Sequence, residues 1–277
     1  IKKGMCSYIL YGYFNLNEVP KNSMIRKSLL QFISFRILFF LDQLLAKFYL
    51  NRKKILFSSG LIGFNLNKII KKYDINIINL HWVNYGMISI KQISKIDIPI
   101  IWTLRDAWCF TGGCHVPMNC VKYENECSKC PQLNSTNKRD LSNQIFLLKS
   151  KEYKKIKKIK FVAISKQLAN QAEKSKLINQ PIQTIPNLID FEQLNSKHKL
   201  YSRKKLKLKN KPTILFQNTS GEFWKGTENV EKIIDYLGNK YQFTSFGHGR
   251  GYSGAVNLGY TKNRDLLSNF YSSADIF

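Results

Sequence analysis

The chain has 277 residues, enough for about two domains with separate cores. Its hydrophobic content of 44% is that of a folded protein and excludes an intrinsically disordered one. The formal net charge of +26 favours anionic partners, namely phosphorylated small molecules, acidic lipid surfaces or nucleic acid. Nucleic acid ranks last, because no tract interleaves basic and aromatic residues as recognisable nucleic-acid-binding modules do.

The first predicted element is the apolar run 32–50. It contains Arg36, Asp42 and Lys47, so we do not expect it to span a membrane, and no signal peptide is visible. The pattern predicts an amphipathic helix, with a core-facing helix favoured over one that lies on a membrane. We expect a cytoplasmic location, with peripheral docking on the inner face of the plasma membrane as the option that the basic charge favours.

The remaining elements follow in alternation. Near-continuous apolar runs predict buried strands, and their flanking patterns predict helices. Strands are expected at 75–82, 98–106, 160–165 and 182–190, and helices at 86–95, after Asp140 and at 166–178. The basic segment 196–211 lacks any core-forming period and is expected to be a linker. Beyond it we expect strands at 213–218, 241–247 and 256–260, and helices at 229–237 and 263–274.

Predicted strands and helices alternate on both sides of this linker. The pattern predicts two α/β domains with parallel sheets, covering residues 1–195 and 212–277. Ligands of such domains bind at the carboxyl ends of the strands. The chain starts at Ile1 without a methionine, and a new strand pattern begins at its last residues. We therefore expect a fragment that lacks sequence at both ends.

Four of the six cysteines lie close together in the loop 111–133. They are Cys114, Cys120, Cys127 and Cys130, and the last two form a CxxC pair. Four sulfur ligands suit a structural zinc ion, with Cys109 and His115 as substitute ligands. Reduced cysteines packed in the loop, and disulfides or a redox role, are the open alternatives.

Other candidate residues stand at predicted strand ends. Arg105 and Asp106 stand at the end of the strand 98–106 and are expected to be catalytic; His81 stands near the end of the strand before it. In the second domain, Lys225 and Gly226 open a helix and suggest an anion site. Donor-binding candidates are Asn218, Lys225, Gly226 and Gly247. The glycines around His248 do not open a helix, which argues against NAD binding, and no Ser/His/Asp set or HExxH pattern supports a hydrolase.

Several of these segments together resemble the retaining glycosyltransferases of family 4, most closely those of colanic-acid and other exopolysaccharide assembly. The segments are 78–93, 99–133, 161–177, 185–190 and 224–230, and the loop ending in CPQL is the most specific part. The resemblance implies the GT-B fold, in which two Rossmann-like domains face each other across a cleft. It also implies transfer of a hexosyl group from a UDP- or GDP-sugar to a saccharide or lipid-linked acceptor, with no catalytic metal.

The resemblance assigns residues as well. Lys225 matches the family lysine that grips the donor diphosphate, whereas the family arginine has no counterpart in 218–224. Arg105 stands where many relatives have a histidine, and Leu188 replaces a turn glycine. These departures leave a non-catalytic GT-B-like binding protein or inactive fragment as one alternative. The net charge and the cysteines leave a zinc-stabilised nucleic-acid binder as another.

Overall fold

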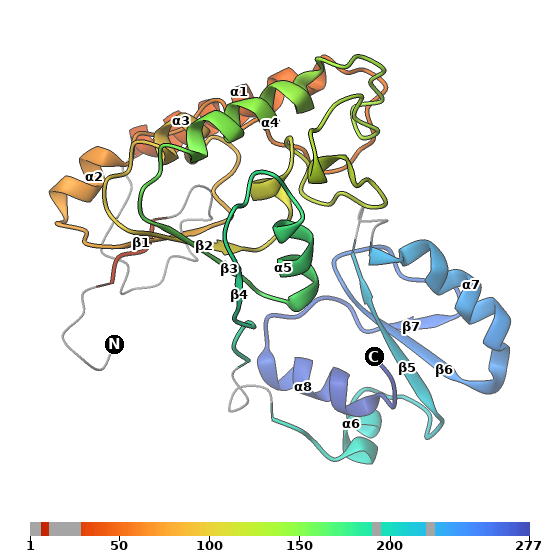
Figure 1. Ribbon diagram of the computed structural model, residues 1–277. Helices are drawn as coiled ribbons and strands as arrows, with labels where there is room; N and C mark the ends of the chain where they lie inside the picture. The colour runs from red at the N-terminus through yellow and green to blue at the C-terminus, as the bar shows by residue number, and fades with distance from the viewer. Residues whose placement is uncertain (1–6, 11–28, 190–194, 220–224) are drawn as a thin grey trace. The chain divides into compact units, whose positions relative to one another are not determined.

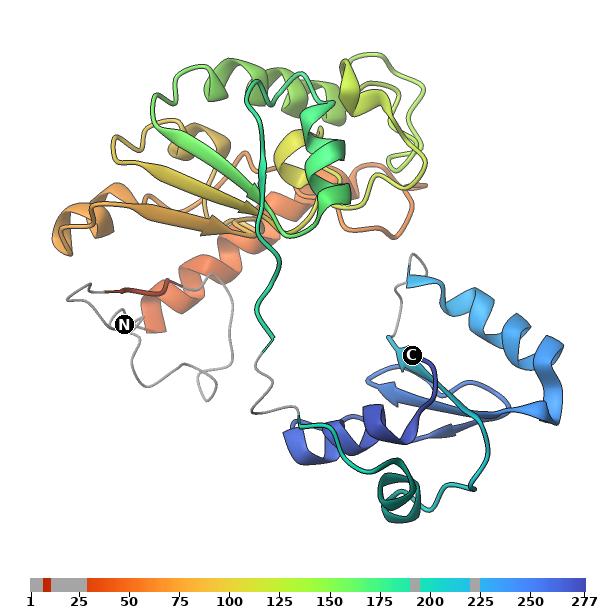
Figure 2. The same ribbon diagram turned by 60° about the horizontal axis from the view of Figure 1, so that its bottom comes forward.

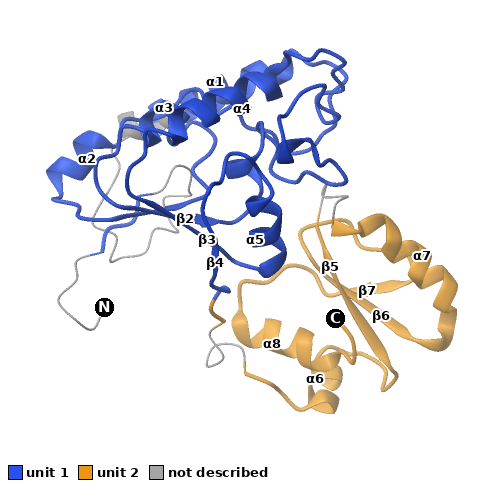
Figure 3. Ribbon diagram, in the orientation of Figure 1, with its two compact units in different colours: residues 1–187 blue, residues 188–277 orange. Residues whose placement is uncertain are grey.

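The computed structural model describes residues 7–10, 29–189, 195–219 and 225–277. The chain divides into two compact units, residues 1–187 and 188–277 (Figure 3). Both are built from parallel strands and helices, so the α/β class with Rossmann-like parallel sheets is confirmed. Within the described residues, no helix combines the length and the apolar content that crossing a bilayer requires.

Unit 1 contains a four-stranded parallel sheet (Figure 1). Its strands lie in the order β1 (Ile78–His81), β2 (Ile100–Leu104), β3 (Ile159–Ala163) and β4 (Gln183–Thr184). The central strand β2 is almost wholly buried, as its apolar run predicts. By contrast, β1 exposes alternate residues, because it lies at the edge of the described sheet and packs on fewer neighbours.

The described part of unit 1 contains five α-helices, of which the last three begin at capping residues. The five are α1 (Leu29–Lys47), α2 (Asn67–Lys72), α3 (Ile90–Ile93), α4 (Leu141–Tyr153) and α5 (Lys166–Glu173), with short 3-10 helices at Trp108–Phe110 and Lys122–Glu124. Asp140 caps α4 by accepting the Asn143 N–H, and Ser165 caps α5 by accepting the Leu168 N–H. Helices α3 and α4 lie side by side in both ribbon views (Figures 1 and 2). One continuous core joins the sheet to these helices, with Trp102, Trp108 and Phe110 at its centre.

Unit 2 contains a parallel sheet in the order β5 (Thr213–Asn218), β6 (Gln242–Gly247) and β7 (Ala255–Asn257). Helix α7 (Thr227–Leu237) packs on the face that carries Ile214 and Phe216. Helices α6 (Lys199–Lys205) and α8 (Arg264–Ser273) pack on the opposite face, around Leu215. Alternate residues of β5 thus bury on both faces, which is the doubly covered sheet that the sequence predicts. A short 3-10 helix, Gly238–Lys240, follows α7.

The expected linker 196–211 differs from the structure. It holds α6, which belongs to unit 2 and packs against α8, and the boundary between the units lies at residue 187 instead. The reason is that α6 buries polar side chains: Ser202 bonds to Asn269, and Arg203 bonds to the carbonyl oxygen of Ser273. A search for apolar periodicity does not detect a helix that is anchored by hydrogen bonds.

Candidate functional site

The strands of unit 1 are parallel, so the residues that follow them lie at one edge of the sheet. β1 ends at His81, Arg105 follows β2, and Asn187 lies shortly after β4. The exposed guanidinium of Arg105 donates a 2.8 Å hydrogen bond to the side-chain oxygen of Asn187. Burial, and secondly the charge of Arg105, lower the pKa of His81. This edge therefore presents a cation, an imidazole with little tendency to protonate and an amide, which are groups that can hold hydroxyls or phosphates.

A buried hydrogen-bonded chain lies behind this edge. Asp106 Oδ2 pairs with His115 Nδ1 at 2.6 Å, and His115 Nε2 lies 2.8 Å from Ser58 Oγ. The expectation that the chain has no Ser/His/Asp set is therefore wrong for the folded molecule, because these side chains come from distant positions. However, Ser58 and His115 are only 0% and 2% exposed, so the hydroxyl is not accessible as a nucleophile.

Asp106 takes a positioning part in this geometry. Its Oδ1 accepts the Trp108 N–H at 2.9 Å, so both carboxylate oxygens are used inside the unit. Of the two expected catalytic residues, Arg105 thus faces solvent at the strand ends, whereas Asp106 holds His115 and the turn after β2.

Two aromatic residues stand next to His115. The ring centroid of Trp82 lies 5.9 Å from that of His115 and 5.0 Å from that of Tyr85. Trp82 is 39% exposed, and both Trp82 and Tyr85 have positive φ, 43° and 56°, which bulky side chains rarely adopt. Backbone of this kind is maintained only where the surroundings enforce it, and it clusters at binding sites. Aromatic faces beside a few polar groups are typical of pockets for small ligands.

Asp42 links α1 to the same region. Its Oδ1 accepts the Ser59 hydroxyl at 2.5 Å and the Gly60 N–H at 2.8 Å, while its Oδ2 has no hydrogen-bond partner in the described part of the chain. Burial raises the pKa of this carboxyl, and the bonds from Ser59 and Gly60 oppose the rise. An aspartate inside an otherwise apolar helical run was the sequence signal for this site, although the prediction used it only to exclude a membrane span.

In unit 2, Asn218 and Gly247 end β5 and β6 and pair directly across the sheet. A Cβ on Gly247 would lie 2.0 Å from the Asn218 carbonyl oxygen, so this position requires glycine for packing. The Asn218 side-chain nitrogen is buried and has no partner among the described residues. His248, next along the chain, stacks on Tyr260 with centroids 3.5 Å apart.

The predicted anion site lies at the start of α7. Gly226 is the residue before the helix, with φ 77°, and the exposed Lys225 precedes it. Residues 220–224, which join β5 to this point, lie outside the described residues. The structure therefore brings Asn218 and Gly247 together and places Lys225 and Gly226 at a helix start.

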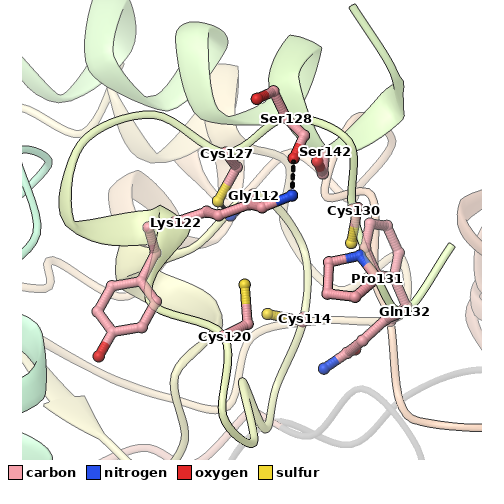
Figure 4. Close-up of a pocket in the computed structure, with 12 residues that line it drawn as sticks. Gly112, Cys114, Cys120, Lys122, Cys127, Ser128, Cys130, Pro131, Gln132 and Ser142 are labelled. Carbon is pink, nitrogen blue, oxygen red and sulfur yellow. Dashed lines mark hydrogen bonds between the residues drawn. The ribbon is translucent and has the colours of Figure 1, made fainter. Parts of the chain in front are cut away.

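The four cysteines of the loop 111–133 line one pocket, and Figure 4 shows their sulfur atoms turned toward it. The five cysteines in the described ranges are free thiols. Burial raises the pKa of the Cys127 thiol to about 12 and also raises that of Cys114. Nowhere in the described ranges are three or more His, Cys, Asp or Glu side chains already assembled as a metal-ligand group.

The two expected substitute ligands lie outside this pocket. His115 has both ring nitrogens engaged by Asp106 and Ser58, and Cys109 is buried in the core beside Lys149 and Tyr153. Neither residue lines the pocket. The prediction that His115 or Cys109 could replace one of the four cysteines as a ligand is therefore wrong.

No family model matches the chain. The chain is 23% identical over 150 residues to WcaC of Escherichia coli (strain K12), which is named as a glycosyl transferase of colanic acid biosynthesis. The match covers 49% of this chain and 34% of WcaC, so the chain spans about a third of the length of the curated relative it matches. This distant similarity supports a glycosyltransferase, and parallel α/β units fit a Rossmann-like one.

Proposed function

We propose that the protein is a retaining glycosyltransferase of family 4 with the GT-B fold. It moves a hexosyl group from a UDP- or GDP-sugar to a saccharide or lipid-linked acceptor in the assembly of bacterial cell-surface polysaccharide. The observation that carries this proposal is the 150-residue similarity to a glycosyl transferase of colanic acid biosynthesis. The basic surface suits a protein that docks on anionic lipid at the inner face of the plasma membrane.

In this proposal, the carboxyl edge of the unit 1 sheet takes the acceptor. Arg105 is exposed, already hydrogen-bonded to Asn187, and able to make a bidentate contact with a phosphate. Trp82 offers an exposed ring for a sugar face, and its neighbour His81 offers an imidazole for a hydroxyl. The half-buried Asp106 and the buried His115 hold the backbone from which Arg105 projects.

Unit 2 takes the donor in this proposal. The start of α7 presents backbone N–H groups and Lys225, and both favour a diphosphate. A cation there stabilises the negative charge that develops on the leaving nucleoside diphosphate. Asn218 and Gly247, at the ends of neighbouring strands, lie where ligands of parallel sheets bind.

A transfer assay tests the proposal. The chain is incubated with a panel of UDP- and GDP-sugars and lipid-linked saccharides, products are detected by mass, and the anomeric configuration is read by NMR. Arg105→Ala should lower the transfer rate about tenfold to a thousandfold, because a charged contact near the reacting groups is lost. Arg139→Ala, an exposed arginine elsewhere in unit 1, is the matched control and should leave the rate unchanged.

Two results would contradict parts of this account. An inverted product would overturn retention while leaving sugar transfer in place. Donor binding without any transfer across the panel would favour a non-catalytic binding protein instead.

A further inference from the structure

The four-cysteine pocket in the loop 111–133 is separate from the strand ends to which the proposed function assigns the acceptor and the donor. Its walls include Phe57, Gly112, Tyr123 and Pro131 in addition to the four cysteines. The cysteines come from three parts of the loop: Cys114 after the 3-10 helix Trp108–Phe110, Cys120 before the 3-10 helix Lys122–Glu124, and the CxxC pair after it. An ion bound by all four sulfurs would therefore tie together three segments that only short 3-10 helices structure.

A backbone amide is directed at one of the sulfurs. The Gly112 N–H donates a hydrogen bond to Cys127 Sγ at 3.2 Å. A Cβ on Gly112 would lie 2.2 Å from the Ser142 carbonyl oxygen, so only glycine allows this backbone to approach so closely.

The hairpin that carries the CxxC pair is held in place independently of any ion. The Cys130 N–H donates to Asp140 Oδ2 at 2.7 Å, and Asn143 Nδ2 donates to the Cys127 carbonyl oxygen at 2.9 Å. Between the two cysteines, Lys129 takes a left-handed backbone with φ 44°, which turns the chain back within two residues. The two sulfurs are therefore presented from a turn that hydrogen bonds fasten to the residues at the start of α4.

The other two sulfurs, those of Cys114 and Cys120, are anchored less directly. Cys114 forms an antiparallel bridge with Phe57, and the Thr111 hydroxyl donates to its carbonyl oxygen at 2.7 Å. Cys120 is held by a turn, in which its N–H donates to the Pro117 carbonyl oxygen at 3.0 Å.

We infer that Cys114, Cys120, Cys127 and Cys130 bind one zinc ion, which closes the loop 111–133 as a structural clasp. Four sulfur donors suit tetrahedral zinc at about 2.3 Å per bond and leave no position for a water or substrate. As the ion binds, each thiol loses its proton to solvent and the thiolate forms the bond, so no oxidant or reductant is needed. His115 and Cys109 take no part, because both are committed elsewhere.

Metal analysis of the purified chain tests this inference. Inductively coupled plasma mass spectrometry should find about one zinc per chain, and a mercurial reagent that blocks thiols should release it. Replacement of the zinc by cobalt should give the absorption bands of a tetrahedral thiolate site. None of these readouts depends on transferase activity, so they can fail while the proposed function stands, and the reverse also holds.

Variants locate the site. Cys127→Ser and Cys120→Ser should each lose most of the zinc, whereas Cys109→Ala, a buried cysteine outside the pocket, should retain it. If a serine variant does not fold, the wild-type measurements still decide. A zinc-free, folded wild-type chain with reactive thiols would overturn the inference, and so would a mass that shows disulfides among these four cysteines.

Discussion

Lys149 is fully buried in unit 1, where this single side chain fixes the backbone of the loop that precedes the cysteines. Its ammonium donates hydrogen bonds to the carbonyl oxygens of Trp108 and Thr111, and it lies 3.6 Å from the centroid of the Trp108 ring. Burial lowers its pKa to about 7. Lys149 therefore fastens the start of the loop to α4 from within the core.

Lys149→Met should lower the free energy of unfolding by about 1–3 kcal/mol, because it removes the charged donor from two buried carbonyl groups and leaves that of Trp108 with only the 3.4 Å hydrogen bond from the Thr111 N–H. Lys151→Met, at an exposed position of the same helix, should change it by less than about 0.5 kcal/mol. Urea denaturation of both variants measures the effect. Equal stability of the two would show that the carbonyl groups find other donors.

Asp106 is the second residue whose hydrogen-bond partners determine its contribution to stability. Asp106→Asn should destabilise the unit by about 1–3 kcal/mol. The NH2 group of asparagine takes the place of one carboxylate oxygen, so either His115 or the Trp108 N–H loses its acceptor. Asp97→Asn, at an exposed position before β2, is the control and should be neutral. If the two variants unfold at the same urea concentration, the buried chain from Asp106 to Ser58 contributes nothing to stability.

At the scale of elements, the contact between β5 and β6 depends on Gly247. Its φ is 133°, and an added Cβ would meet the Asn218 carbonyl oxygen. Gly247→Ala should cost about 2 kcal/mol or more, since both the backbone and the neighbouring strand must shift. At Gly251 a Cβ would meet only the Asn257 side chain, so Gly251→Ala should be tolerated. Thermal unfolding of the two variants compares them, and similar melting temperatures would contradict the close approach.

Most elements were predictable because their signals are local. The apolar runs predict β2, β3 and β5, and Asp140 predicts the start of α4. Two features were not predictable in this way. Helix α6 is basic and anchored by polar contacts, and β1 is only half-buried because it lies at the edge of the described sheet.

The candidate site was predictable only in part for the same reason. Arg105 and His81 follow strands, so the parallel pattern places them at one edge. The pairing of His115 with Ser58 joins positions 57 residues apart, and no local pattern reports such a contact. Periodicity predicts which residues are buried but does not identify their hydrogen-bond partners.

At the scale of the whole molecule, Asp275 closes unit 2. Its carboxylate pairs with Arg203 and Lys199 and accepts the Thr213 N–H, so it joins the end of the chain to α6 and β5. The hydrogen bond from Lys199, followed by that from the Thr213 N–H, lowers its pKa to about 2.

This shift predicts how stability depends on pH. The carboxyl has a lower pKa in the folded chain than its usual 3.8, so its contribution is present above about pH 4 and is lost as the pH falls toward 2. Asp275→Asn should therefore flatten the fall in stability between about pH 4 and 2. Asp235→Asn, on an exposed face of α7, is the control. Urea denaturation at several pH values measures both, and identical slopes for wild type and Asp275→Asn would contradict the prediction.

Binding of a nucleotide sugar is the most direct test of the central claim that this is a glycosyltransferase. Calorimetric titration of the chain with a panel of UDP- and GDP-sugars should detect binding of at least one. Lys225→Ala should weaken it about tenfold, or about 1.4 kcal/mol, whereas Lys232→Ala, at an exposed position within α7, should not. A folded chain that binds no member of the panel would contradict the claim.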